Sequence, residues 1–473
     1  MDTPSYGDDR PIVARATSPA ESALTLFRIS GKDSIEKTAS VFSRPRALRE
    51  APGHTVVRGW ILNRGERIDE VLVSVYRAPR SYTGEDSLDL SCHGGMAAAK
   101  AVLAALRGAG FRDSLPGEFS FRAFMNGKLD LTRAESVMEL VSAKTDRGRE
   151  GAIRRLSGVL EKEITEIKSL LVRVLAGVEL FLDYSEDEIG ETGSGASDSE
   201  ALGRLPDRPL AGEALERLRV LAAGYRRERL YHDGALVVIA GRPNAGKSSL
   251  FNRLVNEDRS IVTEIPGTTR DWVEAWMTLE GIPIRLVDTA GLRDSADPVE
   301  RLGVSRSREL LGEADLVLYL IDGTVGFTPE DRALTADLRP ILYLWNKADK
   351  AGFSSPPPPG GDLLELSAKT GAGLPELTAA LTAFLEAPCR GPAGGFDPAD
   401  RPDAGIGTER QKERIDAAIA ALDEALGLTD QGKPLDIIAP LLREGINALG
   451  EITGEVSTAD ILETMFSRFC VGK

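Results

Sequence analysis

Residues 241–248 have the types and spacing that phosphate binding requires. They read Gly-Arg-Pro-Asn-Ala-Gly-Lys-Ser, a G-x-x-x-x-G-K-S pattern that directly follows the apolar run 235–240. In such a loop the backbone N–H groups surround phosphate oxygens, the lysine neutralises them, and the serine hydroxyl is a ligand for Mg²⁺. The segment therefore predicts a nucleoside-triphosphate site in which Lys247 and Ser248 carry these two roles.

Further elements follow in the order expected of a guanine-nucleotide switch. Asp288 and Gly291 begin and end a D-x-x-G element after an apolar run, and residues 346–349 read Asn-Lys-Ala-Asp after another. The Asp349 carboxylate can accept two hydrogen bonds from the guanine edge, which adenine does not offer. Between the phosphate loop and the D-x-x-G element, Thr269 is the candidate second Mg²⁺ ligand. Together these elements predict a GTP-binding domain.

The residue that orients the attacking water is indicated less directly. Many regulatory GTPases carry a glutamine immediately after the D-x-x-G element, whereas this chain has Leu292, which cannot hold a water. Either hydrolysis is therefore slow or another acid orients the water, and Glu300, eight residues further on, is the candidate catalytic residue. The alternative is that Glu300 is an ordinary solvated surface carboxylate.

Hydrophobic patterning outlines the architecture that must position these residues. Up to about Phe119, short β-rich runs alternate with Ala-rich helical stretches, which predicts an α/β domain. Helical patterns dominate before and after the GTP-binding segment, and apolar residues from Leu156 to Val178 recur at steps of three or four, which predicts one long helix. Neither helical flank can bury its apolar stripe alone.

We therefore expect an α/β plus α fold class, in which a Ras-like P-loop GTPase domain is inserted into a helical domain. The expected segments are 1–122 for the N-terminal α/β domain, 123–232 and 388–473 for the two halves of the helical domain, and 233–387 for the GTPase domain.

Composition narrows the class of protein further. The chain has 473 residues with 58 Lys and Arg against 73 Asp and Glu, a net charge of −15. Such acidity argues against non-specific coating of nucleic acid, so an RNA contact needs a local basic patch or a basic partner. There is no apolar signal core near the start, and no apolar run reaches the roughly 18 residues that span a bilayer. The sequence thus predicts a cytoplasmic protein without a membrane segment.

Outside the nucleotide elements, the chain resembles the MnmE family, also called TrmE, of GTPases that modify the wobble uridine of tRNA. The resemblance covers nearly the whole chain. The segments that carry it are residues 28–31, 82–86, 92–95, 116–119, 122–131, 449–455 and 469–473.

The resemblance implies a K⁺-stimulated, Mg²⁺-dependent GTPase that forms a homodimer through its N-terminal domain. It implies that the protein acts with the flavoprotein MnmG, also called GidA, to install a carboxymethylaminomethyl or aminomethyl group at C5 of the tRNA wobble uridine. The one-carbon donor would be 5-formyltetrahydrofolate or a related folate, bound by the N-terminal domain.

The resemblance also assigns residues to ligands. The cationic and carboxylate side chains expected at the folate are Arg28, Glu85, Lys128 and Lys473. The oxygen donors expected at K⁺ are those of Asn244, Thr263, Ile265 and Thr268. Cys470 either takes part in the tRNA chemistry through its thiol or is a small buried residue at a helix end.

The motif elements and the resemblance together define the expected guanine-nucleotide site. Its residues are Asn244, Ala245, Gly246, Lys247, Ser248, Ser249, Thr263, Glu264, Ile265, Pro266, Gly267, Thr268, Thr269, Asp288, Thr289, Ala290, Gly291, Asn346, Lys347, Asp349, Ser367, Ala368 and Lys369.

Two other functions remain open at this point. One is a GTP switch that binds ribosomal RNA during ribosome assembly, like Era or Der. Era would require a downstream KH domain and Der a second G domain, and neither pattern is found, while the N-terminal α/β domain has no place in either. The other is a GTPase scaffold with no role in modification.

Overall fold

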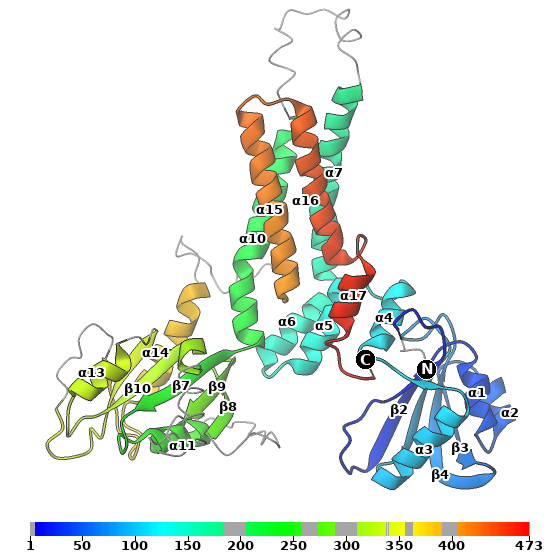
Figure 1. The fold of residues 1–473 in the computed structure, drawn as a ribbon, viewed down its shortest axis with the longest axis horizontal. Helices are drawn as coiled ribbons and strands as arrows, with labels where there is room; N and C mark the ends of the chain where they lie inside the picture. Colours follow the sequence, from blue (N-terminus) through cyan, green and yellow to red (C-terminus); the bar gives the residue numbers. More distant parts are fainter. Residues whose placement is uncertain are drawn as a thin grey trace, which may run out of the picture. The chain divides into compact units, whose positions relative to one another are not determined.

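A computed structural model of the chain describes residues 5–183, 205–257, 273–288, 310–336, 338, 340–354, 363–389 and 405–472. The chain divides into two compact units, the first comprising residues 1–138, 155–214 and 417–473, and the second residues 139–154 and 215–416. Each unit contains its own sheet together with helices (Figure 1). The predicted fold class, an N-terminal α/β domain and a helical domain interrupted by a P-loop domain, is confirmed.

The sheet of the first unit is largely antiparallel, with strand order β3-β4-β5-β2-β1-β6 and one parallel pair, β1 with β6. Alternate side chains, such as Val71, Val73 and Val75, are buried on one face, and they belong to the same core as residues of the helices α1 (Ser34–Ser40), α2 (Pro45–Glu50) and α3 (Met96–Gly108). The strands are β1 (Ile12–Arg15), β2 (Leu24–Ser30), β3 (Thr55–Asn63), β4 (Glu66–Tyr76), β5 (Ser87–His93) and β6 (Arg112–Asp113).

The helical part is built from segments on both sides of the inserted domain. Gly445 of α16 faces Leu171 of α7 and Leu422 of α15, so three helices meet at this position, where a Cβ would make ordinary van der Waals contact with both leucines. Arg208 at the start of α10 pairs with Asp430 at the end of α15. The helices are α4 (Glu118–Met125), α5 (Leu131–Ser142), α6 (Asp146–Leu156), α7 (Val159–Asp183), α10 (Arg208–His232), α15 (Glu409–Asp430), α16 (Leu435–Thr453) and α17 (Ala459–Phe466).

The prediction of one long helix from Leu156 to Val178 is wrong at its first residue. Leu156 is the last residue of α6, and α7 begins at Val159. Between them Gly158 has a φ of +89°, a left-handed conformation that ends one helix and starts another. The four-residue step from Leu156 to Leu160 continued the helical period across this turn. The remaining stripe, from Leu160 to Val178, is buried as predicted.

The sheet of the second unit is parallel except for its edge hairpin β8–β9, with order β12-β11-β10-β7-β9-β8. Residues 316–321 of β10 are all buried, as expected for a strand covered on both faces. The strands are β7 (Ala235–Gly241), β8 (Val273–Leu279), β9 (Ile282–Asp288), β10 (Leu316–Asp322), β11 (Ile341–Asn346) and β12 (Leu363–Glu365). The accompanying helices are α11 (Lys247–Glu257), α13 (Pro329–Thr335) and α14 (Leu374–Glu386).

Parallel pairing brings the carboxyl ends of the central strands to one edge of this sheet. Asp322 lies opposite Asn346, and Ile239 lies opposite Asp288.

Among the described residues, no helix is long and apolar enough to cross a membrane.

Candidate guanine-nucleotide site

The phosphate loop is a tight connection between β7 and α11. Gly241 has a φ of +142°, and a Cβ there would lie 2.4 Å from the Leu320 carbonyl oxygen. Gly246 has a φ of +106°, and a Cβ there would lie 2.2 Å from Nδ2 of Asn346. Both positions therefore require glycine, for backbone conformation and for space. The spacing that the motif predicts is imposed by the neighbouring strands.

Lys247 lies at the centre of this loop. Its side chain is buried, and Nζ donates hydrogen bonds to the carbonyl oxygens of Gly241 (2.7 Å) and Arg242 (3.0 Å). Burial lowers the pKa of Lys247, and the nearby charge of Asp288 opposes this shift. An ammonium group held here is suited to neutralising phosphate oxygens.

The donor set also suits a magnesium nucleotide. Ser248 is exposed at the first turn of α11, and Asp288 is buried at the carboxyl end of β9. A hydroxyl and a carboxylate beside a phosphate loop are oxygen donors of the kind that Mg²⁺ prefers. Mg²⁺ bound there would neutralise charge on the phosphates, and Ser248 and Asp288 are the described oxygen donors that would hold it.

The expected base-recognition elements meet through Asn346. Its side-chain Nδ2 donates to the Ala245 carbonyl oxygen (2.7 Å), and its Oδ1 accepts from the backbone N–H of Ala368 (2.9 Å). The Ser367 hydroxyl donates to Oδ1 of Asp349 (2.6 Å) and lowers the pKa of that exposed carboxyl. Asp349 thus stays an acceptor-only carboxylate, the form that reads the guanine edge.

Two groups of supporting contacts at this edge are not indicated by the sequence motifs. Asp331, wholly buried, accepts hydrogen bonds from Nε of Arg242 (3.1 Å) and from the Tyr319 hydroxyl (2.9 Å). Lys347 pairs with Asp322 at the end of β10. The Thr-x-x-Asp capping pattern that begins at Thr328 could have indicated a helix start at α13, but not that its aspartate reaches the phosphate loop.

Part of the expected site falls outside the described residues and stays a prediction. This applies to Thr263, Glu264, Ile265, Pro266, Gly267, Thr268, Thr269, Thr289, Ala290, Gly291, Glu300 and Lys473. Of the described residues, Asn244 and Ser249 are exposed in the loop or just beyond it, and Lys369 is exposed after Ala368.

A second group of expected site residues surrounds residues 79–85 of the N-terminal domain. The Arg28 guanidinium lies 5.8 Å from the centre of the Tyr82 ring and pairs with Asp89 through Nε (3.2 Å). Glu85 accepts from the Ser30 hydroxyl (2.8 Å). Lys128 donates to the Pro79 carbonyl oxygen at the other end of the same loop (3.0 Å).

Residue Arg122 supports this group but was not among the predicted site residues. It is buried and pairs with Glu85 (3.2 Å) and with Glu118 (3.0 Å), which is also buried and also paired with Arg112. The ion pair with Arg122 therefore holds the Glu85 carboxylate in place. Its position in the chain, four residues after Glu118 on a short helix, signals an ion pair but not the contact with Glu85.

The C-terminal segment reaches the same domain. Nη1 of Arg28 donates to the Gly472 carbonyl oxygen (3.3 Å). The backbone N–H of Gly117 donates to the Cys470 carbonyl oxygen (3.2 Å). The option that Cys470 is a buried residue at a helix end is wrong: α17 ends at Phe466, and Cys470 is exposed. Phe466 and Phe469 are the residues that pack into the core at this end.

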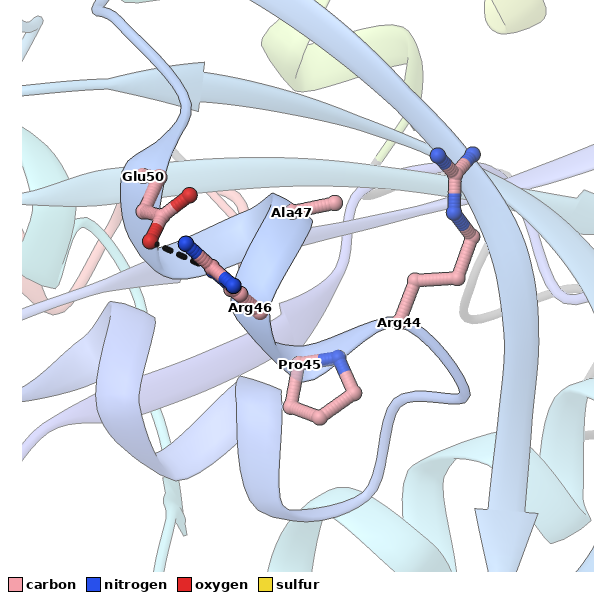
Figure 2. Close-up of a pocket in the computed structure, with 5 residues that line it drawn as sticks. All are labelled: Arg44, Pro45, Arg46, Ala47 and Glu50. Carbon is pink, nitrogen blue, oxygen red and sulfur yellow. Dashed lines mark hydrogen bonds and ion pairs between the residues drawn. The ribbon is translucent and has the colours of Figure 1, made fainter.

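Two surface hollows lie apart from these groups. One, of about 420 Å³, is lined by residues 44–47 and Glu50 at α2, and Figure 2 shows these residues, with Arg46 paired to Glu50. A second hollow of about 360 Å³ lies between Arg15, Phe27 and residues of α3. Neither contains a predicted site residue, so the candidate site is defined by its side chains and backbone and not by these cavities.

Comparison with known proteins decides the family. The chain matches the model of the MnmE helical domain over residues 131–470 and that of the GTP-binding protein TrmE N-terminus over residues 11–128. It is 41% identical to the tRNA modification GTPase MnmE of Treponema denticola, over 99% of both chains. The chain belongs to the MnmE family. As a member of this family, it is a tRNA modification GTPase, an enzyme that hydrolyses GTP.

Other relatives agree with this placement. The protein named tRNA modification GTPase MnmE from Symbiobacterium thermophilum is 39% identical over 98% of this chain and 100% of its own. Among solved structures, the G domain of the T. maritima FeoB iron transporter aligns with 32% of this chain and 98% of that one at 26% identity. Its TM-score of 0.25 is too low to carry an argument about function.

Proposed function

We propose that this MnmE family member is a K⁺-stimulated, Mg²⁺-dependent GTPase that acts as a homodimer with the flavoprotein MnmG. Together they would install a carboxymethylaminomethyl or aminomethyl group at C5 of the tRNA wobble uridine, with 5-formyltetrahydrofolate or a related folate as donor. The observation that carries the proposal is that Arg28 and Gly472, 444 positions apart, meet beside Tyr82 in the N-terminal α/β domain. A protein that only hydrolysed GTP would have no need of this polar group in its N-terminal domain.

The chemistry of the N-terminal group suits a folate. Arg28 and Lys128 supply positive charge for a glutamate tail, and Glu85 supplies a carboxylate acceptor for the N–H groups of a pterin ring. Lys473 follows Gly472 directly and would add a third cation. The exposed thiol of Cys470, two residues before Gly472, is available for a role in the tRNA chemistry.

On the GTPase side, we assign Mg²⁺ to Ser248 and Thr269, and K⁺ to Asn244 with oxygens of Thr263, Ile265 and Thr268. Asn244 is exposed in the phosphate loop, so its side-chain oxygen is accessible to a cation. A cation there would supply the positive charge that an arginine finger supplies in other GTPases. Glu300 is proposed to orient the attacking water.

Mass spectrometry of tRNA nucleosides tests the proposed function. A strain without this protein should lose the modified wobble uridines, and the wild-type gene should restore them. Genes carrying Lys247→Met or Glu85→Gln should each fail to restore them, because one lacks nucleotide and the other folate. Unchanged wobble nucleosides in the deletion strain, accompanied by accumulating ribosomal RNA precursors, would instead favour an Era-like role.

A further inference from the structure

We propose that Lys144 is a positioning residue for GTP hydrolysis, which acts by holding the β8–β9 hairpin through Trp276. Lys144 lies in the short turn between α5 and α6. We call this turn, together with the last residue of α5 and the first three residues of α6, the elbow (residues 142–148). Its Nζ lies 3.4 Å from the centre of the Trp276 ring on β8. The inference requires only the GTP hydrolysis already established and none of the folate, K⁺ or RNA chemistry.

The cation is closely placed on this ring. Partial burial lowers the pKa of Lys144, Asp233 opposes that shift, and Arg285, opposite Trp276 on β9, reinforces it. Arg285 is itself engaged by Glu274 (2.7 Å). The closest described contact that holds Lys144 is therefore the face of the Trp276 ring, and the charge of Asp233 adds an attraction to it.

A second residue of the elbow contacts the same hairpin at its turn. Gly281, with a φ of +83°, lies against the aliphatic stem of Arg147: a Cβ there would be 2.8 Å from Cδ of Arg147. The guanidinium of Arg147 continues to Tyr231, donating to its hydroxyl (2.6 Å) with Cζ 4.8 Å from the ring centre. The hairpin is therefore contacted at a strand and at its turn.

The elbow also contacts the chain just before the phosphate-loop strand. The Thr145 hydroxyl donates to the Tyr231 carbonyl oxygen (3.2 Å), and the Tyr231 hydroxyl donates to Glu386 at the end of α14 (2.7 Å). β7 begins four residues after Tyr231 and ends in the loop that holds Lys247. The elbow thus contacts both the β8–β9 hairpin and the segment that leads into β7.

The hairpin leads directly to the nucleotide chemistry. Trp276 pairs with Arg285, and three residues further along β9 lies Asp288, which also faces β7 through its pairing with Ile239. Asp288 acts electrostatically on Lys247. Because Trp276, Arg285 and Asp288 lie on one hairpin at the edge of the sheet, a shift of that hairpin against β7 changes the position of Asp288 relative to Lys247. Misplacement of this kind lowers reaction rates.

Steady-state hydrolysis of GTP by the full chain tests the proposal, with three variants. Lys144→Gln removes the cation, Lys144→Arg keeps it, and Lys162→Gln removes an exposed lysine of α7 as the matched control. We expect Lys144→Gln to lower kcat roughly 3- to 10-fold, the size of one cation–π contact. The affinity for GDP should stay unchanged, the Tm should fall by no more than about 4 °C, and Lys144→Arg should retain most of the rate.

Tryptophan emission supplies a readout that a purely structural role would not move. The contribution of Trp276, taken as wild type minus Trp276→Phe, should differ between the GDP complex and a complex with a non-hydrolysable GTP analogue. Lys144→Gln should abolish that difference. The proposal is overturned if Lys144→Gln leaves kcat at the wild-type value, if Lys144→Arg is as impaired as Lys144→Gln, or if kcat falls only together with Tm and GDP affinity.

Discussion

The two sheets of this protein position their functional groups in opposite ways. In the second unit, parallel strands end at one edge, so short contiguous motifs at strand ends place Lys247, Asn346 and Asp288 close together. In the first unit, an antiparallel sheet alternates strand ends between two edges, and Arg28, Glu85 and Lys128 come from a strand, a loop and a segment beyond α4. Their arrangement depends on buried ion pairs and on the C-terminal segment. The comparison predicts that each region can be disabled alone.

The largest effect is expected from Arg122→Met in the antiparallel region. Arg122 bonds Glu85, Glu118 and the carbonyl oxygens of Asp8 and Arg10, and it is buried. The variant leaves the buried carboxylate of Glu118 and the half-buried carboxylate of Glu85 with fewer partners, which should lower the free energy of unfolding of the first unit by about 3 kcal/mol. This is the lower end of the range for a broken buried ion pair, because Arg112 still pairs with Glu118. Urea unfolding followed by circular dichroism measures it. Loss of GTP hydrolysis in folded protein would contradict the separation of the two regions.

Lys247→Met should have the next largest effect, confined to the parallel sheet. The ammonium group at the centre of the phosphate loop is the main described positive charge there, and its removal should reduce kcat/KM for GTP by roughly 10²- to 10³-fold. Lys350→Met, which removes an exposed lysine next to Asp349, is the control and should retain activity. If the two variants hydrolyse GTP equally well, Lys247 does not hold the phosphates.

A smaller effect is expected from Asp349→Asn. The amide presents a donor where the carboxylate presents only acceptors, so the affinity for GDP should fall roughly 10- to 100-fold. The affinity for xanthosine diphosphate, which has an oxygen where guanine has an amino group, should fall less than the affinity for GDP. Fluorescence titration with labelled nucleotides gives both constants. Equal losses for the two nucleotides would show that Asp349 supports the loop without contacting the base.

The smallest effect concerns pH and His232, at the end of α10. Its hydrogen bond to Asp233 (2.8 Å) raises the pKa of His232, and its other ring nitrogen faces the Glu139 carbonyl oxygen (3.1 Å). Because the folded pKa exceeds the unfolded value of about 6.5, this contribution to stability is complete below that pH and is lost as pH rises through the folded pKa. The Tm of the wild type should therefore fall over that range more than the Tm of His232→Gln. Asp233→Asn should flatten the profile likewise, and parallel profiles would refute the assignment.

The sequence predicts features that depend on local spacing better than contacts between distant residues. The nucleotide elements were predictable because their roles depend on local spacing after apolar strands, as in residues 241–248 and 346–349. The contact of Arg122 with Glu85 and that of Lys144 with Trp276 were not, because each joins residues far apart in the chain. The break at Gly158 was missed for a local reason, since the step from Leu156 to Leu160 preserved the helical period across a left-handed turn.

The central claim is that guanine nucleotide and folate bind to separate sheets. Isothermal titration of GDP and of 5-formyltetrahydrofolate into wild type, Lys247→Met and Glu85→Gln tests it most directly. We expect Lys247→Met to lose GDP binding and keep folate binding, and Glu85→Gln to do the reverse. Wild-type folate binding by Glu85→Gln, or loss of both ligands in either folded variant, would contradict the claim.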